Sequence, residues 1–175
     1  MSLKFYEVDK NYIIFLKKYD GQVPDFIYSR HNKFVCGVVF KIGDIDYFAP
    51  ISSFKQQQRT NIVILDKGIP ISSIRFCFMI PAPPQVVKLK DFSVEPQSYQ
   101  DLLNAEIKFC NSNVNRIFKK AEEVYKIGSN RSHPLAYSCC GFKLLEAKCV
   151  EYISLIIELG QTAATCDEKD RYQKL

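Results

Sequence analysis

The hydrophobic pattern of this chain changes its period near residue 90, and this change limits the possible folds most strongly. Before residue 90, short β-branched and aromatic runs are separated by turn residues, which is typical of β-strands. After it, apolar residues recur every three or four positions, which is typical of amphipathic helices. A strand-rich first part followed by a helical second part predicts an α+β fold.

The first part predicts five or six short strands and one short helix. The strands are expected at Lys4–Val8, Phe34–Ile42, Asp46–Pro50, Ile62–Leu65, Ile74–Pro81 and Val86–Leu89, and the helix at Asn11–Tyr19. Gly43 and Asp44 predict a hairpin turn, and Gly68–Ser73 predicts another turn. Short strands joined by tight turns favour a strongly bent antiparallel sheet, and we expect a compact SH3-like barrel.

The second part predicts two helices that pack outside this barrel. The first covers about residues 98–127, with Ser98 and Asp101 spaced as a capping box and Gly128 as its stop. The second covers about residues 141–159. We therefore expect a single domain over residues 1–175, with a barrel at about 1–90, a helical elaboration at about 91–160 and a charged tail at 161–175.

Composition narrows the compartment and the partners. The chain has 47% hydrophobic residues and no apolar run that could span a bilayer, and its N-terminus lacks the apolar region of a secretory signal. The seven cysteines contain no CxxC pair and there are only two histidines, so we expect reduced thiols and no metal site. These features predict a cytoplasmic protein without a membrane partner. A net charge of +5 permits an anionic partner.

Five segments occur in an order and spacing that resemble a known family. They are KFYEVDKNYI at Lys4–Ile13, KFVCGVVFKI at Lys33–Ile42, YFAPISSFK at Tyr47–Lys55, FMIP at Phe78–Pro81 and FKLLEAK at Phe142–Lys148. No single segment is specific, but the ordered set resembles the ToxN/AbiQ/CptN family of bacterial type III toxin–antitoxin toxins. The resemblance extends from about Lys4 to about Tyr152.

The resemblance implies an endoribonuclease toxin that needs no metal or other cofactor and leaves a 2′,3′-cyclic phosphate. It also implies a small antitoxin RNA, which derives from tandem repeats, is processed by the toxin and inhibits it. Toxin and RNA would assemble into a closed hetero-oligomer. Cellular or phage RNA would be the substrate, and abortive infection, a form of phage defence, would be the biological role.

The active-site positions of the family fall on five residues of this chain, which are Tyr12, Lys33, Ser52, Ser53 and Lys55. The chain departs from the family pattern in two places. Phe54 stands where family members often have proline, and Gln56–Arg59 stands where they have a histidine shortly after the lysine. The second departure removes an obvious proton shuttle, for which His31 is a possible substitute.

The chemistry of these residue types suits RNA cleavage, because the 2′-hydroxyl of RNA is itself the nucleophile. Serine hydroxyls are poor bases, so Ser52 and Ser53 are expected to donate hydrogen bonds to phosphate oxygens. Lys33 begins one strand of the predicted hairpin and Lys55 follows the end of its partner, so the two amines can face one phosphate. We expect them to share charge stabilisation, and one of them could transfer protons if its pKa falls, at a cost of about 1.4 kcal/mol per unit.

A second group of residues are candidates for contact with the RNA backbone. They are Arg30, His31, Arg59, Arg116, Lys119 and Lys120. Most such residues are equally well explained as solvent-exposed cations that bind no partner. The two serines could likewise form an ordinary turn, and Tyr12 could be a half-buried core residue, without either having a catalytic role.

Two other functions remain open at this point. A barrel toxin that acts on a protein target such as a topoisomerase would need no catalytic lysine. A non-catalytic RNA-binding module would use the same cations without cutting. A metal-dependent hydrolase is disfavoured because the acidic residues lack a ligand-like spacing. Cleavage of naked RNA in the presence of a chelator would separate these functions.

Overall fold

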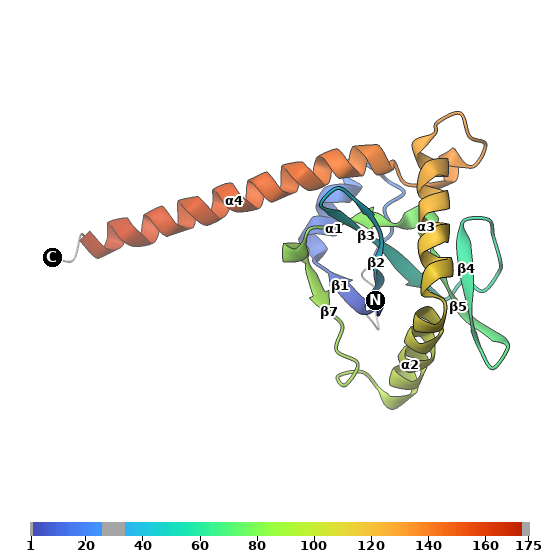
Figure 1. Cartoon of the computed structure of the whole chain (residues 1–175). Helices are drawn as coiled ribbons and strands as arrows, with labels where there is room; N and C mark the ends of the chain where they lie inside the picture. The colour runs from blue at the N-terminus through green and yellow to red at the C-terminus, as the bar shows by residue number, and fades with distance from the viewer. Residues whose placement is uncertain (1, 26–33, 173–175) are drawn as a thin grey trace.

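The computed structural model describes the backbone of residues 2–25 and 34–172 and the side chains through residue 158. These residues form an α+β fold with one seven-stranded antiparallel sheet and four α-helices. Figure 1 shows α2 and α3 along one side of the sheet, whereas α4 leaves the body and extends away from it.

Most strands lie where the sequence predicted them, except the fifth, most of which falls on a predicted turn. They are β1 (Phe5–Val8), β2 (Val35–Ile42), β3 (Ile45–Ser52), β4 (Asn61–Asp66), β5 (Ile69–Arg75), β6 (Ile80–Pro81) and β7 (Val87–Leu89). Their order in the sheet is β4-β5-β3-β2-β1-β7, and β6 pairs with β3.

The prediction of a closed barrel was wrong, because the sheet is open. The strands β4 and β7 stand at the two ends of the order, and no pairing in the described part of the chain joins them. The helix α2 (Gln97–Ser112) packs against β4 and β5, so a helix covers this end of the sheet where a barrel would require another strand. At the other end, β7 has only three residues and pairs with β1 alone.

The second hairpin also differs from expectation. Ile69 already pairs with Asp66, so only Lys67 and Gly68 form the turn between β4 and β5, and both have positive φ (49° and 83°). The predicted turn over residues 68–73 is therefore mostly strand. The predicted strand over residues 74–81 is interrupted by a 3-10 turn (Phe76–Phe78), which buries the consecutive residues Phe76 and Cys77; an extended strand would point them to opposite faces.

The predicted helix over residues 98–127 is in fact two helices, α2 and α3 (Val114–Ser129). Asn113 separates them with φ −126° and ψ 22°, and its side-chain amide donates a hydrogen bond to the carbonyl of Phe109 (2.9 Å). Asparagine competes in this way with helical backbone bonds, and the apolar periodicity continues across the break. The Ser98 capping box does not form, because α2 starts after Pro96 without a side-chain cap.

Two further helices pack against each other beside the sheet. Asp9 caps the short helix α1 (Lys10–Lys17) by accepting hydrogen bonds from the amides of Asn11 and Tyr12. The helix α4 (Phe142–Tyr172) is longer than the predicted 141–159. Tyr152 of α4 packs its ring against Tyr12 of α1 (centroids 4.9 Å apart).

Aromatic side chains connect the helices to the sheet. Tyr125 of α3 stacks on Phe142 of α4, with ring centroids 5.5 Å apart, and Tyr47 of β3 approaches both rings edge-on. The hydroxyls of Tyr47 and Tyr125 donate to one oxygen of Glu146, at 2.9 and 2.5 Å. Among the described side chains, six cysteines are buried as free thiols: Cys36, Cys77, Cys110, Cys139, Cys140 and Cys149.

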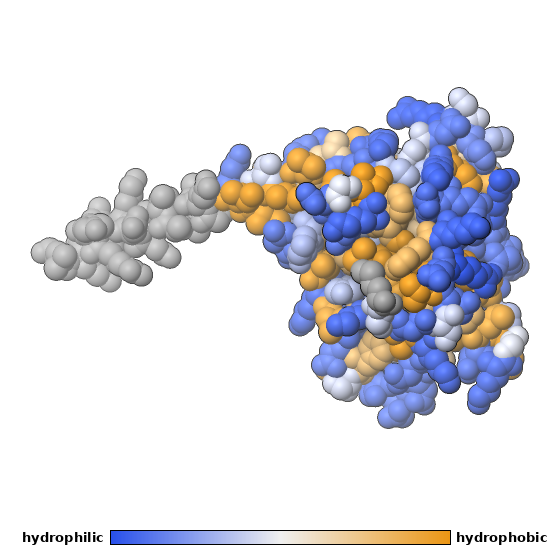
Figure 2. Space-filling model, viewed as in Figure 1, coloured by the Kyte–Doolittle hydropathy of each residue, from blue (hydrophilic) through white to orange (hydrophobic). Residues whose placement is uncertain are grey.

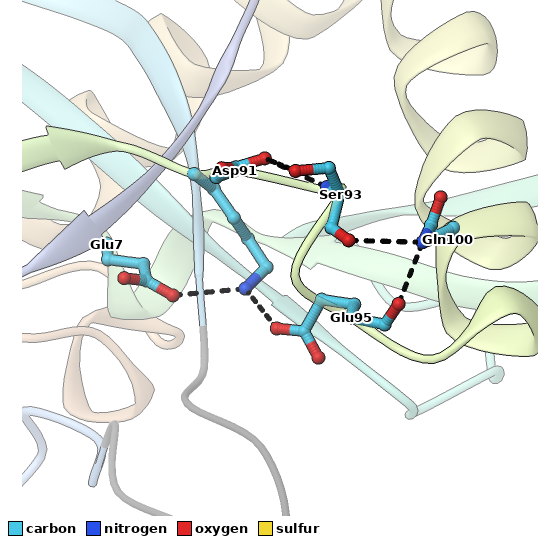
Figure 3. A network of polar contacts seen from close by, with 6 residues as sticks. Glu7, Asp91, Ser93, Glu95 and Gln100 are labelled. Carbon is cyan, nitrogen blue, oxygen red and sulfur yellow. Dashed lines mark hydrogen bonds and ion pairs between the residues drawn. The ribbon is translucent and has the colours of Figure 1, made fainter.

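A buried ion-pair network anchors the connection between β7 and α2 (Figure 3). The amine of Lys90 lies 3.0 Å from a carboxylate oxygen of Glu7 and 2.8 Å from one of Glu95. Burial lowers the pKa of Lys90, but hydrogen bonds to Glu95 and Glu7 outweigh it and raise the pKa overall. Gln100 of α2 donates to the carbonyl of Glu95, so the network ties β1 to the start of α2.

Exposed apolar side chains gather where α4 leaves the body, as Figure 2 shows. Val150, Leu155 and Ile157 are all exposed there. In the described part of the chain, no helix combines the length and the apolar character needed to cross a bilayer.

Candidate functional site

The two predicted serines lie where β3 ends. Ser52 is the last residue of β3 and pairs with Ser73 of β5, so both side chains share one face of the sheet. The hydroxyl oxygen of Ser52 accepts a hydrogen bond from the backbone amide of Phe54 (3.3 Å), which turns the chain out of the strand. Ser53 is exposed within this turn. The fold therefore uses Ser52 to shape the turn and leaves the hydroxyl of Ser53 open to solvent.

A buried asparagine holds the loop that follows. The side chain of Asn61, at the start of β4, donates to the carbonyl of Gln56 (2.9 Å) and accepts from the backbone amide of Gln58 (2.8 Å). The side-chain amide of Gln57 donates to both oxygens of Asn61, at 2.9 and 3.0 Å. These bonds fix a loop on which Lys55 and Arg59 are exposed. The sequence prediction missed Asn61, since a polar residue before a strand is an ordinary feature.

The predicted backbone-binding cations come only partly together. The amine of Lys120 in α3 donates to the carbonyl of Arg59 (3.4 Å) and pairs with Glu123 (2.7 Å). One face of α3 is thereby placed beside the loop of Lys55. Arg116 lies one helical turn before Lys120, and it is exposed, as is Lys119. Lys120 thus lies beside the loop that carries Lys55 and Arg59, although its amine is paired with Glu123, and Arg116 lies further along α3.

The structure does not bring Tyr12 to this region. Tyr12 is completely buried, and its hydroxyl donates to the carbonyl of Pro81 (2.6 Å). Burial raises the pKa of this phenol well above its usual range. Placement in the core supports the structural explanation for Tyr12, which is that it fastens α1 to β6, and argues against contact with a substrate.

Three predicted residues, Arg30, His31 and Lys33, lie outside the described residues. Phe34, which follows Lys33 in the sequence, is buried, and its carbonyl accepts a hydrogen bond from the amide of Ile51 (3.4 Å). The described chain therefore resumes beside the last residues of β3.

A buried carboxylate lies behind β5. Glu106 of α2 is only 2% exposed, and one of its oxygens has no hydrogen-bond partner among the described residues. Burial raises the pKa of Glu106 to about 7, which the nearby hydroxyl of Ser72 partly counteracts. Ser72 precedes Ser73, the strand partner of Ser52. Neighbouring strand residues point to opposite faces, so the buried carboxylate beside Ser72 lies on the other face of β5 from Ser73.

The described residues contain no group of three or more histidine, cysteine, aspartate or glutamate side chains arranged to hold a metal ion. The candidate residues at and just after the end of β3 instead carry hydroxyls and cations. Such groups bind phosphate oxygens by hydrogen bonds and charge.

The sequence match and the structural match point to the same proteins. The family described as Toxin ToxN, type III toxin–antitoxin system, matches residues 4–150. A protein named Endoribonuclease ToxN, from Bacillus thuringiensis subsp. kurstaki, is 30% identical over 163 residues, which cover 85% of this chain and 84% of that protein.

Two solved structures share the fold. One comes from work on selective toxin inhibition by a non-coding RNA pseudoknot; it has a TM-score of 0.80 and 28% identity, and the match covers 87% of this chain and 98% of the other. The other is AbiQ, a lactococcal anti-phage endoribonuclease, with a TM-score of 0.79, 25% identity and coverage of 88% and 99%. The ordered motifs, the fold and these matches agree, and the chain therefore belongs to the ToxN family of type III toxin–antitoxin toxins.

Proposed function

We propose that this chain is an endoribonuclease that acts on RNA in the bacterial cytoplasm. The observation that carries the proposal is the family match over residues 4–150, together with relatives named endoribonuclease. The end of β3 supports it, because an exposed hydroxyl at Ser53 and an exposed amine at Lys55 stand two residues apart on a loop that Asn61 holds in place.

The proposed reaction is a transesterification that needs no metal. The 2′-oxygen forms a bond to phosphorus, the bond from phosphorus to the 5′-oxygen breaks, and the products carry a 2′,3′-cyclic phosphate and a 5′-hydroxyl. One proton leaves the 2′-hydroxyl and one reaches the departing 5′-oxygen. Ser53 donates a hydrogen bond to a non-bridging oxygen, while Lys55 and Lys33 stabilise the charge that develops there. One of the two lysines transfers protons.

Ser52 has a different part in this proposal. Its oxygen already accepts the amide hydrogen of Phe54, which sets the conformation of the turn. Its hydroxyl hydrogen remains available as a second donor to phosphate. We therefore assign Ser53 to direct phosphate contact and Ser52 mainly to positioning Ser53. We assign Tyr12 to the packing of α1 and not to substrate contact, because its side chain is in the core.

The proposed partner is a small antitoxin RNA. A structural relative comes from work on toxin inhibition by a non-coding RNA pseudoknot. We propose that this chain likewise processes an RNA of tandem repeats, is inhibited by the product, and forms a closed toxin–RNA hetero-oligomer with it. The cations of Lys55, Arg59 and Lys120 would bind its phosphates, with Arg116 and Lys119 further along α3. Phage or cellular RNA would be the other substrate.

Cleavage of single-stranded RNA by purified protein in EDTA tests the enzymatic proposal. We expect products with cyclic phosphate ends, and we expect S53A and K55A each to slow cleavage by on the order of 100-fold, the usual effect of losing one contact to a developing oxyanion. The matched controls are S98A and K88A, which change exposed residues of α2 and β7.

The outcomes separate the alternatives. Cleavage that requires added Mg²⁺ would refute the metal-independent mechanism, and full activity in S53A would remove Ser53 from it. RNA that is bound but never cut would identify a non-catalytic RNA-binding module.

A further inference from the structure

The side chain of Arg75 packs between two aromatic rings at the end of β5. Its guanidinium carbon lies 4.5 Å from the ring centre of Phe54 and 5.0 Å from that of Phe78. All three side chains are half-buried. Aromatic faces attract a guanidinium and hold its plane, so this arginine has a defined orientation.

The charge of Arg75 has no anionic partner among the described residues. Neither a carboxylate ion pair nor a side-chain hydrogen bond reaches it there, and its Nε atom is buried without a partner. A half-buried cation usually pairs with an anion, because partial burial removes part of its hydration. The aromatic rings compensate for some of this loss but offer no acceptor for the N–H donors.

Arg75 belongs to the same surface as the proposed site. Ser73 pairs with Ser52, so their side chains share one face, and Arg75 follows Ser73 by two residues on that face. Phe54, on which the guanidinium stacks, lies between Ser53 and Lys55 in the sequence. The backbone amide of Phe54 is in turn bound by Ser52. Phe54 thus connects Arg75, a cation with no anionic partner among the described residues, to the exposed hydroxyl of Ser53 and the exposed amine of Lys55.

We propose that Arg75 binds a phosphate of the RNA chain next to the one that is cut. A guanidinium donates two parallel hydrogen bonds to phosphate oxygens, and a guanidinium already held by stacking loses little conformational freedom on binding. Arg75 is a binding residue in this inference, since Ser53 and the lysines contact the reacting phosphate. The inference rests on the proposed function, because it takes RNA to be the ligand.

The test measures binding of an RNA that cannot be cleaved. The probe is a fluorescent single-stranded RNA with 2′-O-methyl groups throughout, titrated at several salt concentrations. We expect R75M to raise the Kd roughly 10-fold and to reduce the slope of log Kd against log salt by about 0.7, the value for one lost phosphate contact on single-stranded nucleic acid. We expect R75K to bind with an intermediate Kd, because lysine keeps the charge but loses the fork.

The matched control is R131M, which removes an exposed arginine from the loop between α3 and α4. An R75M protein that is folded and has the Kd and salt slope of the unmodified protein would overturn the inference while leaving the proposed function intact. An unmodified protein that neither binds nor cuts RNA would instead refute the proposed function.

If R75M does not fold, chemical labelling of arginine side chains in the protein without substitutions provides a second test. Phenylglyoxal reacts with accessible guanidinium groups, and mass spectrometry locates the products. We expect the 2′-O-methyl RNA to slow the reaction at Arg75 more than at Arg131. Equal reaction with and without RNA would overturn the inference, as would an Arg75 that does not react at all.

Discussion

Glu106 shows how a single residue can set the pH dependence of stability. Its carboxyl group has a pKa of about 7 in the folded chain, against 4.5 for an unperturbed glutamate, because it is buried in α2 against β5. Between these values the folded state binds a proton that the unfolded state has lost. The contribution of Glu106 to stability is therefore greatest below pH 4.5 and falls as the pH rises towards 7.

The corresponding prediction concerns E106Q. Glutamine cannot ionise, so the variant should lack the decrease of about 3 kcal/mol that this shift implies between pH 4.5 and 7. At pH 7.5 the variant should be more stable than the unmodified protein, and at pH 4.5 the two should be similar. Urea unfolding at both pH values measures the difference. E122Q, a change at an exposed glutamate of α3, is the control; equal pH slopes in the unmodified protein and E106Q would contradict the prediction.

At the scale of the elements, the contact of α3 with α4 leaves no room at Gly128. A Cβ atom added there would lie 2.5 Å from a ring carbon of Phe142 and 2.9 Å from the Cβ of Cys139. The sequence prediction assigned Gly128 to the end of a helix, but α3 continues to Ser129, and the glycine permits close packing instead.

G128A should therefore destabilise the protein, although alanine ordinarily favours a helix over glycine by about 1 kcal/mol. Overpacking against Phe142 should cost more, so we expect a net loss of about 1–3 kcal/mol in the free energy of unfolding. Thermal and urea denaturation measure it. G21A is the control, since a Cβ atom at Gly21 would meet nothing within 4 Å. A G128A protein more stable than the unmodified one would contradict the prediction, because it would show that α3 and α4 can move apart without a loss of stability.

At the scale of the whole molecule, α4 extends past the part of the chain shared with its relatives. The family match ends at residue 150, whereas α4 continues to Tyr172. Among the described side chains of α4, Phe142, Leu145 and Cys149 are buried, and all three lie in its first half. Figure 1 shows the second half running away from the sheet.

Deletion of residues 159–175 should consequently leave the core intact. We expect the melting temperature to change by less than about 2 °C, since no buried side chain of the described part is lost. RNA cleavage should also be unchanged in the conditions used for the S53A comparison. Differential scanning calorimetry and the cleavage assay provide the two measurements. A large fall in melting temperature would mean that the distal half of α4 contributes to the fold.

Local patterns were enough to predict most elements, and they placed two exposed residues of the candidate site on one loop. Strands such as β2 and β3 were predictable because runs of β-branched and aromatic residues bounded by turn residues are a local signal. The ordered motifs were enough to indicate the family. Ser53 and Lys55 are both exposed and lie on one loop, which follows from their closeness in the sequence. The break at Asn113 was missed because its cause is a hydrogen bond from one side chain, which leaves the apolar period unchanged.

Contacts between distant residues decided the rest, since periodicity carries no information about which strands or helices meet. The sheet stays open because α2 covers β4, and this packing depends on the path of the chain between them. Tyr12 is buried because α4 returns over α1. Arg75 joins the site because β5 pairs with β3, which places its guanidinium on Phe54, 21 residues earlier in the chain (75 minus 54). Each of these outcomes is a balance of burial and pairing that exists only once the whole chain has folded.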